Sequence, residues 1–172
     1  MRKKRNVTKL QNMRAIEIPR FRAVSSGMQP IDAIFGDGES FHNTWFMSHR
    51  HLLKTHLYEP QDFVWHEDND INKSVWALAV KDDVTEADTL PYEIIEFPGG
   101  MFLVATADEK DNKDLEETVN CMMRWIENSD VFAYGDFPQS GMSNMPNPDG
   151  AIDKALGIAQ QQIYLPIKFR ER

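Results

Sequence analysis

The chain has 172 residues, of which 41% are hydrophobic, and this size suits one domain with a substantial core. Its 19 basic and 27 acidic side chains give a net charge of −8, which argues against a nucleic-acid-binding surface because phosphates require clustered cations. The single cysteine excludes an intrachain disulfide, and no apolar run approaches the ~20 residues of a membrane-spanning helix. We therefore expect a cytoplasmic protein without direct contacts to nucleic acid or membrane.

The first eleven residues differ from the rest of the chain by their basic charge, carried by Arg2, Lys3, Lys4, Arg5 and Lys9. Such an arm could contact nucleic acid or a membrane, but short basic arms are more often solvated tails. We expect residues 1–11 to form a flexible tail and residues 12–172 to form a single domain.

A first strand–helix–strand–strand unit is predicted over residues 12–81. Its first strand, within residues 14–25, contains Pro19, which cannot donate a ladder hydrogen bond and fits an edge or a bulge. Residues 27–38 resemble a loop, and Ser40 can cap a helix that runs to about Tyr58, before Pro60. Strands over residues 62–66 and 75–81 complete the unit, with a turn at residues 68–70 between them.

A polar, acidic linker is predicted over residues 82–90, and the pattern then restarts over residues 91–169. Residues 92–107 predict two strands, broken or bulged at Pro98-Gly99-Gly100. Asp114 and Glu117 have the spacing of a capping box at the start of a helix over residues 114–129. This helix has one apolar stripe, formed by Leu115, Val119, Met122 and Ile126. A short strand over 132–137, a loop over 138–150 and a final strand over 162–169 follow.

Two internal similarities suggest that the units are copies. Residues 16–19 (IEIP) return as residues 95–98 (IEFP), 79 positions later, and residues 75–80 resemble residues 163–168 at an offset of 88. Each pair brackets one helical pattern, so the order of elements supports a duplication. Two such units tend to meet about a pseudo-two-fold axis, and the groove between them would be a natural small-molecule site.

Residues 92–102 (YEIIEFPGGMF) resemble the proline–small–glycine strand of the bacterial GyrI-like ligand-binding domains. These domains also serve as effector-binding domains of AraC-type and BmrR-type transcription regulators. The helix ending at residues 124–126 (RWI) and the strand at residues 163–167 (IYLPI) are similar to the elements that follow in that family. The similarity covers about residues 13–169 and is looser in the first half.

The resemblance implies an α+β fold of duplicated βαββ units, with an antiparallel sheet, helices on one side and a central ligand groove. It further implies a binding domain for lipophilic, drug-like effectors, linked to transcription regulation and multidrug sensing, with no cofactor and no metal. A DNA-binding domain of its own would require roughly another hundred residues. Oligomeric state cannot be inferred from the sequence.

Candidate ligand-binding residues are aromatic side chains that can stack on a flat ligand and acids that can neutralise a cationic one. They are Trp45, Trp65, Trp76, Glu93, Phe132, Tyr134, Asp136 and Tyr164. Each tryptophan could instead pack in the core. Multidrug-binding relatives often carry a glutamate after the second helix, whereas residues 132–137 (FAYGDF) contain only Asp136 as an acid. The ligand is therefore predicted to be lipophilic and either neutral or cationic.

Two other functional classes remain open. One is a small-molecule hydrolase that uses the same groove, with Glu93 or Asp136 acting beside Tyr134 or Tyr164. The other is a protein-interaction module of the gyrase-inhibitor type. No catalytic residue is assigned, since no unambiguous acid–base pair is present. The helical positions of His42, His49 and His56 place neighbours roughly 10 Å apart, too far to share one metal ion.

Overall fold

A ten-stranded antiparallel sheet forms most of the computed structural model, which describes residues 13–54, 62–67, 70–145, 154–155, 157 and 159–171. The main strands run in the spatial order β1-β7-β10-β9-β4-β5-β2-β6, while β3 pairs with β5 and β8 pairs with β10. The first half supplies β1 (Arg14–Ile18), β2 (Phe21–Ser25), β3 (Gln29–Pro30), β4 (Asp62–Glu67) and β5 (Asp70–Ala79). The second supplies β6 (Ile94–Phe97), β7 (Gly100–Asp108), β8 (Phe132–Tyr134), β9 (Met142–Asn144) and β10 (Gln160–Phe169).

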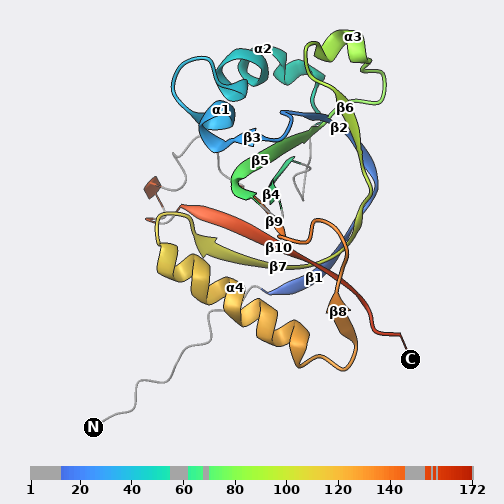
Figure 1. The fold of residues 1–172 in the computed structure, drawn as a ribbon, viewed down its shortest axis with the longest axis vertical. Coiled ribbons are helices and arrows are strands. Elements are labelled where there is room, and N and C mark those ends of the chain that lie inside the picture. The colour runs from blue at the N-terminus through green and yellow to red at the C-terminus, as the bar shows by residue number, and fades with distance from the viewer. Residues whose placement is uncertain are drawn as a thin grey trace.

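Two long, bent strand pairs join the halves. β1 continues into β2 through a bend at Pro19-Arg20, and β6 continues into β7 through a bend at Pro98-Gly99. Because β1 pairs with β7 and β2 pairs with β6, each half contributes one strand to the sheet of the other, and the sheet curls (Figure 1). The interruptions predicted at the two Ile-Glu-x-Pro segments are confirmed as these bends.

The strand registers show the pseudo-two-fold relation. A shift of 79 residues maps the pair Ile16–Phe102 of β1 and β7 onto the pair Ile95–Ala23 of β6 and β2. The same shift maps Val64 of β4 onto Ser143 of β9, and these two residues pair with each other at the centre of the sheet. The predicted duplicated βαββ architecture is therefore confirmed, and its axis passes between β4 and β9.

The last strands of the two halves are related by a different offset from the one inferred from sequence. Ala79 lies opposite Ala23 in the first half, and Pro166 lies opposite Phe102 in the second. The true offset is therefore 87 rather than 88, and Tyr164 corresponds to Ala77, not to Trp76. A shift of one residue along a strand moves every side chain to the other face of the sheet.

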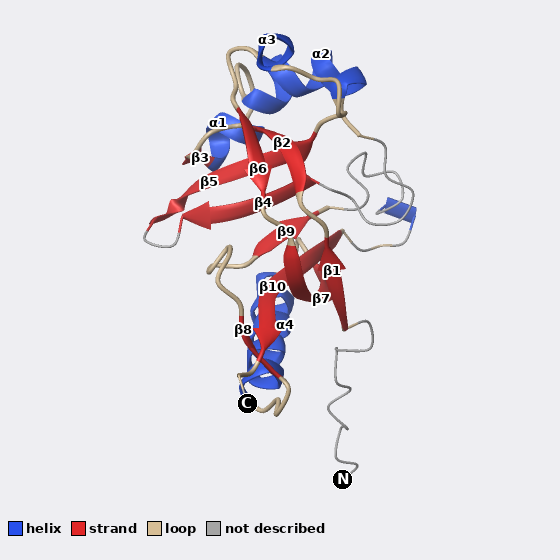
Figure 2. Ribbon diagram, turned by 90° about the vertical axis from the view of Figure 1, so that its right-hand side faces the viewer, coloured by secondary structure: helices blue, strands red, loops and turns tan. Residues whose placement is uncertain are grey.

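Helices cover the outer face of the curled sheet (Figures 1 and 2). In the first half they are short, comprising α1 (Ile31–Phe35), the π-helix η1 (His42–Phe46), α2 (Met47–His49) and the 3₁₀-helix η2 (Arg50–Leu52). These last three elements follow one another without a break, so the helix predicted after Ser40 is confirmed over residues 41–52, and Ser40 Oγ accepts from the Asn43 N–H at 3.3 Å. It is irregular, and the prediction is wrong for residues 53 and 54. Residues 55–58 of the predicted helix, and the basic tail, lie outside the described residues. The predicted loop over 27–38 contains β3 and α1.

The composition of this segment explains why the helix is irregular. Asn, Thr, Trp, Phe, Ser and His dominate residues 42–49, and all are weaker helix formers than Ala, Leu or Glu. Hydroxyl groups also compete for the backbone, because Thr44 Oγ1 donates to the Ser40 carbonyl and Ser48 Oγ donates to that of Thr44.

The described part of the second half contains the regular helix α4 (Asn112–Glu127), close to the predicted range. Its N-cap is Asp111, whose carboxylate accepts from the backbone N–H groups of Lys113 and Asp114. The predicted capping box of Asp114 and Glu117 is therefore wrong, and Asp114 instead accepts from the Asp108 N–H at 2.9 Å, which ties the helix to β7. A capping box does occur in the short α3 (Glu86–Thr89) of the linker, between Thr85 and Asp88.

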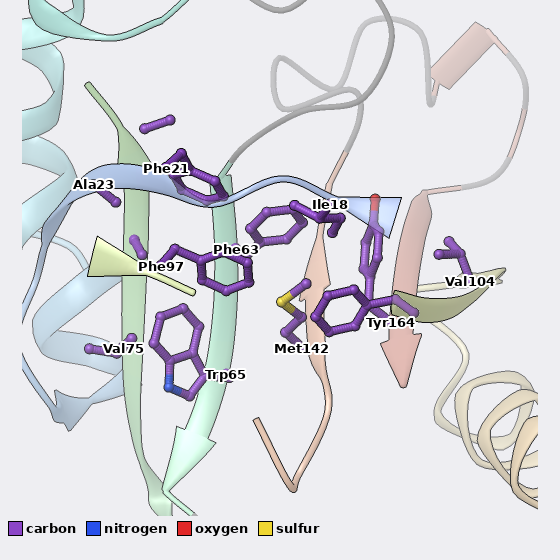
Figure 3. Close-up of a cluster of buried hydrophobic side chains, with 13 residues drawn as sticks. Ile18, Phe21, Ala23, Phe63, Trp65, Val75, Phe97, Val104, Met142 and Tyr164 are labelled. Carbon is purple, nitrogen blue, oxygen red and sulfur yellow. The ribbon is translucent and has the colours of Figure 1, made fainter. Parts of the chain in front are cut away.

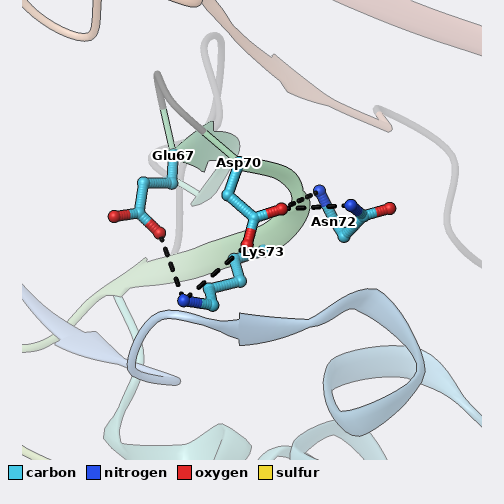
Figure 4. A network of polar contacts seen from close by, with 4 residues as sticks. All are labelled: Glu67, Asp70, Asn72 and Lys73. Carbon is cyan, nitrogen blue, oxygen red and sulfur yellow. Dashed lines mark hydrogen bonds and ion pairs between the residues drawn. The ribbon is translucent and has the colours of Figure 1, made fainter.

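The two hairpins differ in their connections. In the first half, Asp70 accepts from the backbone and side chain of Asn72, and Lys73 lies 3.7–3.8 Å from Asp70 and Glu67 (Figure 4). In the second half, β9 lies inside the region predicted as loop, and 15 residues (145–159) separate it from β10. A three-residue strand has too little alternation to be recognised in sequence. Within the described part of the chain, no helix is long and apolar enough to cross a membrane.

Candidate functional site

The inner face of the sheet carries a cluster of strand side chains from both halves, hereafter the inner cluster (Figure 3). Its buried members are Ile18, Phe21, Ala23, Phe63, Trp65, Val75, Ala77, Ala79, Phe97, Phe102, Val104, Met142 and Tyr164. Two other cores lie between the sheet and the helices, one for each half. Since only strand residues form the inner cluster, it occupies the concave side of the sheet.

Aromatic rings dominate the inner cluster, and Phe97 is its hub. The Phe97 ring centroid lies 4.7 Å from that of Phe21, 5.6 Å from that of Phe63 and 6.3 Å from that of Trp65. Tyr164 packs edge-on against Phe63, with 5.2 Å between the centroids, so the contacts cross from one half to the other. Such ring pairs contribute beyond the area that they bury.

A network of three uncharged polar side chains lies at one side of this apolar surface. The Tyr164 hydroxyl donates to Gln162 Oε1 at 2.5 Å and accepts from Asn144 Nδ2 at 3.2 Å. Tyr164 and Asn144 are buried, with 0% and 4% of their surfaces exposed. Asn144 Oδ1 is buried and accepts no hydrogen bond from the described residues.

Phe137 lies at the rim of the inner cluster. Its ring centroid is 5.6 Å from that of Trp65 and 6.0 Å from that of Phe97, yet 42% of the residue is exposed. Gly135 brings the chain to this point, since its N–H donates to the Pro166 carbonyl and any Cβ at Gly135 would lie 2.9 Å from that of Pro166. A larger residue at position 135 would displace the segment that carries Phe137.

The structure places two of the eight predicted ligand-binding residues, Trp65 and Tyr164, in the inner cluster. Trp45 and Trp76 lie instead in the helix-covered core of the first half. Because the last strands are related by an offset of 87, the residue equivalent to Tyr164 is Ala77. Trp76 is next to Ala77 on β5, so its side chain points to the opposite face of the sheet. For Trp45 the reason is its place in η1, which packs on the outer face.

The other four predicted residues also lie away from the inner cluster. Phe132 stacks on Trp125 of α4 and on Phe169. Tyr134 lies near Glu127 of α4, and burial together with the Glu127 carboxylate raises the pKa of its hydroxyl. The Asp136 carboxylate forms an exposed ion pair with Lys168 at 2.8 Å. Glu93 is exposed, and the nearby acid Glu96 pairs with Arg20 at 2.8 Å on the surface.

Sequence reasoning missed the residues that dominate the inner face, chiefly Phe63, Phe97, Phe137 and Asn144. A signal existed for Phe63, which alternates with Trp65 in a short strand and must share its face. No local signal marks Asn144, because β9 itself was not predicted.

Comparisons with known proteins support the fold. No protein-family model matches the chain, and no curated protein matches it. Among solved structures, SAV2435 bound to tetraphenylphosphonium is similar with a TM-score of 0.53 and 14% identity, over 91% of this chain and 93% of that one. The EcmrR C-terminal domain is similar with a TM-score of 0.58 and 15% identity, over 91% of this chain and 96% of that one.

Two further solved structures are similar to this chain. EcmrR in a complex with DNA is similar with a TM-score of 0.63 and 14% identity, over 91% of this chain but only 57% of the EcmrR chain. A hydrolase from Listeria innocua is similar with a TM-score of 0.56 and 14% identity, over 91% of both chains. The predicted fold is therefore confirmed: this chain has the fold of the GyrI-like effector-binding domains.

Proposed function

We propose that this chain is a cytoplasmic effector-binding domain that holds a small lipophilic ligand on the inner face of its sheet. The observation that carries the proposal is the inner cluster, a group of buried, largely aromatic side chains that strands of both halves supply and that includes no residue of a described helix. The proteins that share this fold include one solved with tetraphenylphosphonium, an aromatic cation. A flat ligand would gain by stacking on Trp65 and Phe97 and by leaving water.

The charge of the ligand follows from the polar groups on this face. The described members of the inner cluster and its hydrogen-bonded network are all uncharged. The predicted acids Glu93 and Asp136 lie on the surface, as does Glu96, and both Asp136 and Glu96 are paired with cations. We therefore propose that recognition rests on stacking and hydrogen bonding, with cation–π attraction as the contribution available to a cationic ligand.

The link to transcription regulation comes from the EcmrR comparison. This chain spans 57% of EcmrR, whose structure was solved with DNA, and it matches the separate EcmrR C-terminal domain almost fully. The described residues include no helix-turn-helix. We propose that the ligand signal is passed to a DNA-binding partner, and that residues 12–172 act as one domain made of repeats 12–81 and 91–169, with a linker at residues 82–90.

A thermal-shift experiment with calorimetric titration tests the proposal. The probes are tetraphenylphosphonium and 4-hydroxybiphenyl, a cation and a neutral aromatic compound. A ligand at 100 times its Kd stabilises the native state by about 2.7 kcal/mol, which is several degrees of unfolding midpoint. A midpoint unchanged by both probes at millimolar concentration would contradict the proposal.

Two exposed phenylalanines provide a matched pair of variants for the same titration. Phe137→Ala removes a ring that contacts Trp65 and Phe97, so we expect both probes to bind severalfold more weakly. Phe169→Ala removes a more exposed ring, 63% against 42%, that packs on Phe132 instead, so we expect unchanged affinity. Equal losses in the two variants would place the ligand elsewhere.

Hydrolysis at the same inner face is the second candidate, favoured by the similarity to the Listeria innocua hydrolase. It requires an acid or base within hydrogen-bond reach of the substrate. Tyr164 is the described titratable side chain within the inner cluster. Mass spectrometry of a bound ester probe after release distinguishes the two functions, because an effector domain returns the probe unchanged.

A further inference from the structure

Asn144 differs from the other polar residues of the inner face because the acceptor oxygen of its side-chain amide has no partner among the described residues. Its residue surface is 4% exposed, and among the described residues Oδ1 has no donor within hydrogen-bond distance. Buried polar groups are nearly always paired, since an unpaired acceptor has lost its water without compensation. A buried acceptor of this kind points to a donor that arrives with a ligand.

The distances within the network identify which atom of the Asn144 amide is unpaired. The 2.5 Å contact between the Tyr164 hydroxyl and Gln162 suits an O–H···O bond, which is shorter than an N–H···O bond. The 3.2 Å contact with Asn144 suits a donating N–H group. Nδ2 is thus engaged with Tyr164, and the atom left over is the carbonyl oxygen, an acceptor.

The position of Asn144 in the fold directs this acceptor towards the inner cluster. Asn144 follows Met142 on β9 by two residues, so both side chains lie on the same face, and Met142 belongs to the inner cluster. The 79-residue shift makes Asn144 the counterpart of Trp65. The inner face therefore presents an aromatic ring at one position and a hydrogen-bond acceptor at the equivalent position across the axis.

We propose that Asn144 Oδ1 recognises an O–H or uncharged N–H donor on an otherwise aromatic ligand, so that the inner face selects neutral donor-bearing aromatic compounds. This inference rests on the proposed function and names its ligand class. The aromatic body stacks in the half that contains Trp65 and Phe97. The donor reaches the half that contains Asn144, where it satisfies the buried carbonyl oxygen.

Two matched probes test the inference by calorimetric titration of the full chain. 4-Hydroxybiphenyl carries a donor, whereas in 4-methoxybiphenyl the same oxygen is methylated and cannot donate. We expect the hydroxyl compound to bind about tenfold more tightly to the wild type, because its analogue leaves the acceptor unpaired. Asn144→Leu should make the two affinities equal.

Two variants control for damage to the fold. Ser143→Ala changes the neighbouring residue on the opposite face of β9, where Ser143 pairs with Gln161, and should preserve the tenfold preference. Asn144→Asp retains the size of the side chain and an acceptor at the same place, so the preference should persist. Its negative charge on the inner face should also strengthen tetraphenylphosphonium binding severalfold.

The outcomes separate the inference from the proposed function. Equal binding of the two biphenyls to the wild type would overturn the role of Asn144 and leave the lipophilic site standing. A preference that survives in Asn144→Leu would do the same. If Asn144→Leu does not fold, an Asn144→Asp variant that binds tetraphenylphosphonium no better than the wild type overturns the inference. Failure of all three compounds to bind the wild type would overturn both proposals.

Discussion

The two halves of this protein share a strand framework but differ in what they place on it. The 79-residue shift holds from β1 to β4, so equal lengths of chain connect β2 to β4 and β7 to β9. One half uses that length for the 16-residue helix α4, and the other divides it among short helices. Strand pairing thus fixes the architecture, while helix regularity follows local composition, with Leu, Glu, Lys and Met in α4.

The inner face shows the same contrast. Trp65 and Ala77 in the first half are replaced by Asn144 and Tyr164 in the second, so an apolar surface faces a polar one across the axis. A strictly symmetric site would bind a ligand equally in two orientations. This difference gives the proposed ligand one preferred orientation.

The largest expected effect concerns Phe97 and its counterpart, Ile18. Phe97→Ala removes the ring that joins Phe21, Phe63 and Trp65, so we expect a loss of about 3–5 kcal/mol in the free energy of unfolding. Ile18→Val removes one methylene from a buried side chain and should cost about 1 kcal/mol. Urea denaturation measures both values. Similar losses in the two variants would contradict the expectation that the Phe97 ring stabilises the cluster by linking the neighbouring rings.

The bends of the two long strand pairs provide the next comparison. Gly99 has φ +74°, and a Cβ there would lie 2.6 Å from the Ile18 carbonyl oxygen and 2.7 Å from the Arg20 nitrogen. We expect Gly99→Ala to destabilise the fold by about 2–3 kcal/mol. Its counterpart Arg20 forms an exposed ion pair with Glu96, so Arg20→Ala should cost less than about 1 kcal/mol. Thermal unfolding would contradict this account if both variants were equally stable.

Asp62, at the start of β4, is expected to destabilise the first half at neutral pH. Burial raises the pKa of its carboxyl from 3.8 to about 6, so the folded state binds the proton more tightly than the unfolded state. Stability therefore falls as pH rises through 6, and the loss is absent below about pH 3.8.

Replacing this carboxyl by an amide tests that cost. After allowance for the partial exposure of Asp62, we expect Asp62→Asn to be more stable than the wild type by about 2 kcal/mol at pH 7.5. The two proteins should be nearly equal near pH 3.5. Unfolding midpoints across this pH range measure the difference, and a pH-independent gap would rule out the titration of Asp62 as its cause.

The smallest effect is expected at Asp136, one of the two acids predicted from sequence to neutralise a cationic ligand. Asp136 is exposed and paired with Lys168, so Asp136→Asn should change stability by no more than about 1 kcal/mol. Its affinity for tetraphenylphosphonium should equal that of the wild type in a calorimetric titration. A large loss of affinity would return Asp136 to the ligand site.

Sequence reasoning located most strands because proline and glycine mark the bends and because apolar residues recur in similar segments. It located α4 from its apolar stripe. The repeat inferred from sequence related β5 and β10 by the wrong offset. The connection from β9 to β10 is eight residues longer than that from β4 to β5, and this difference could not be seen because β9 was not predicted. Trp76 was predicted as a stacking aromatic, but the register turns it to the outer face, and Asn144 was missed because its strand was predicted as a loop.

A crystal structure of the protein with 4-hydroxybiphenyl tests the central claim most directly. We expect ligand density on the inner face, with the rings against Trp65 and Phe97 and the hydroxyl about 2.5–3.0 Å from Asn144 Oδ1, as O–H···O bonds require. Density on the outer face of α4, beside Met123 and Arg124, or an inner cluster unchanged at saturating probe, would contradict it.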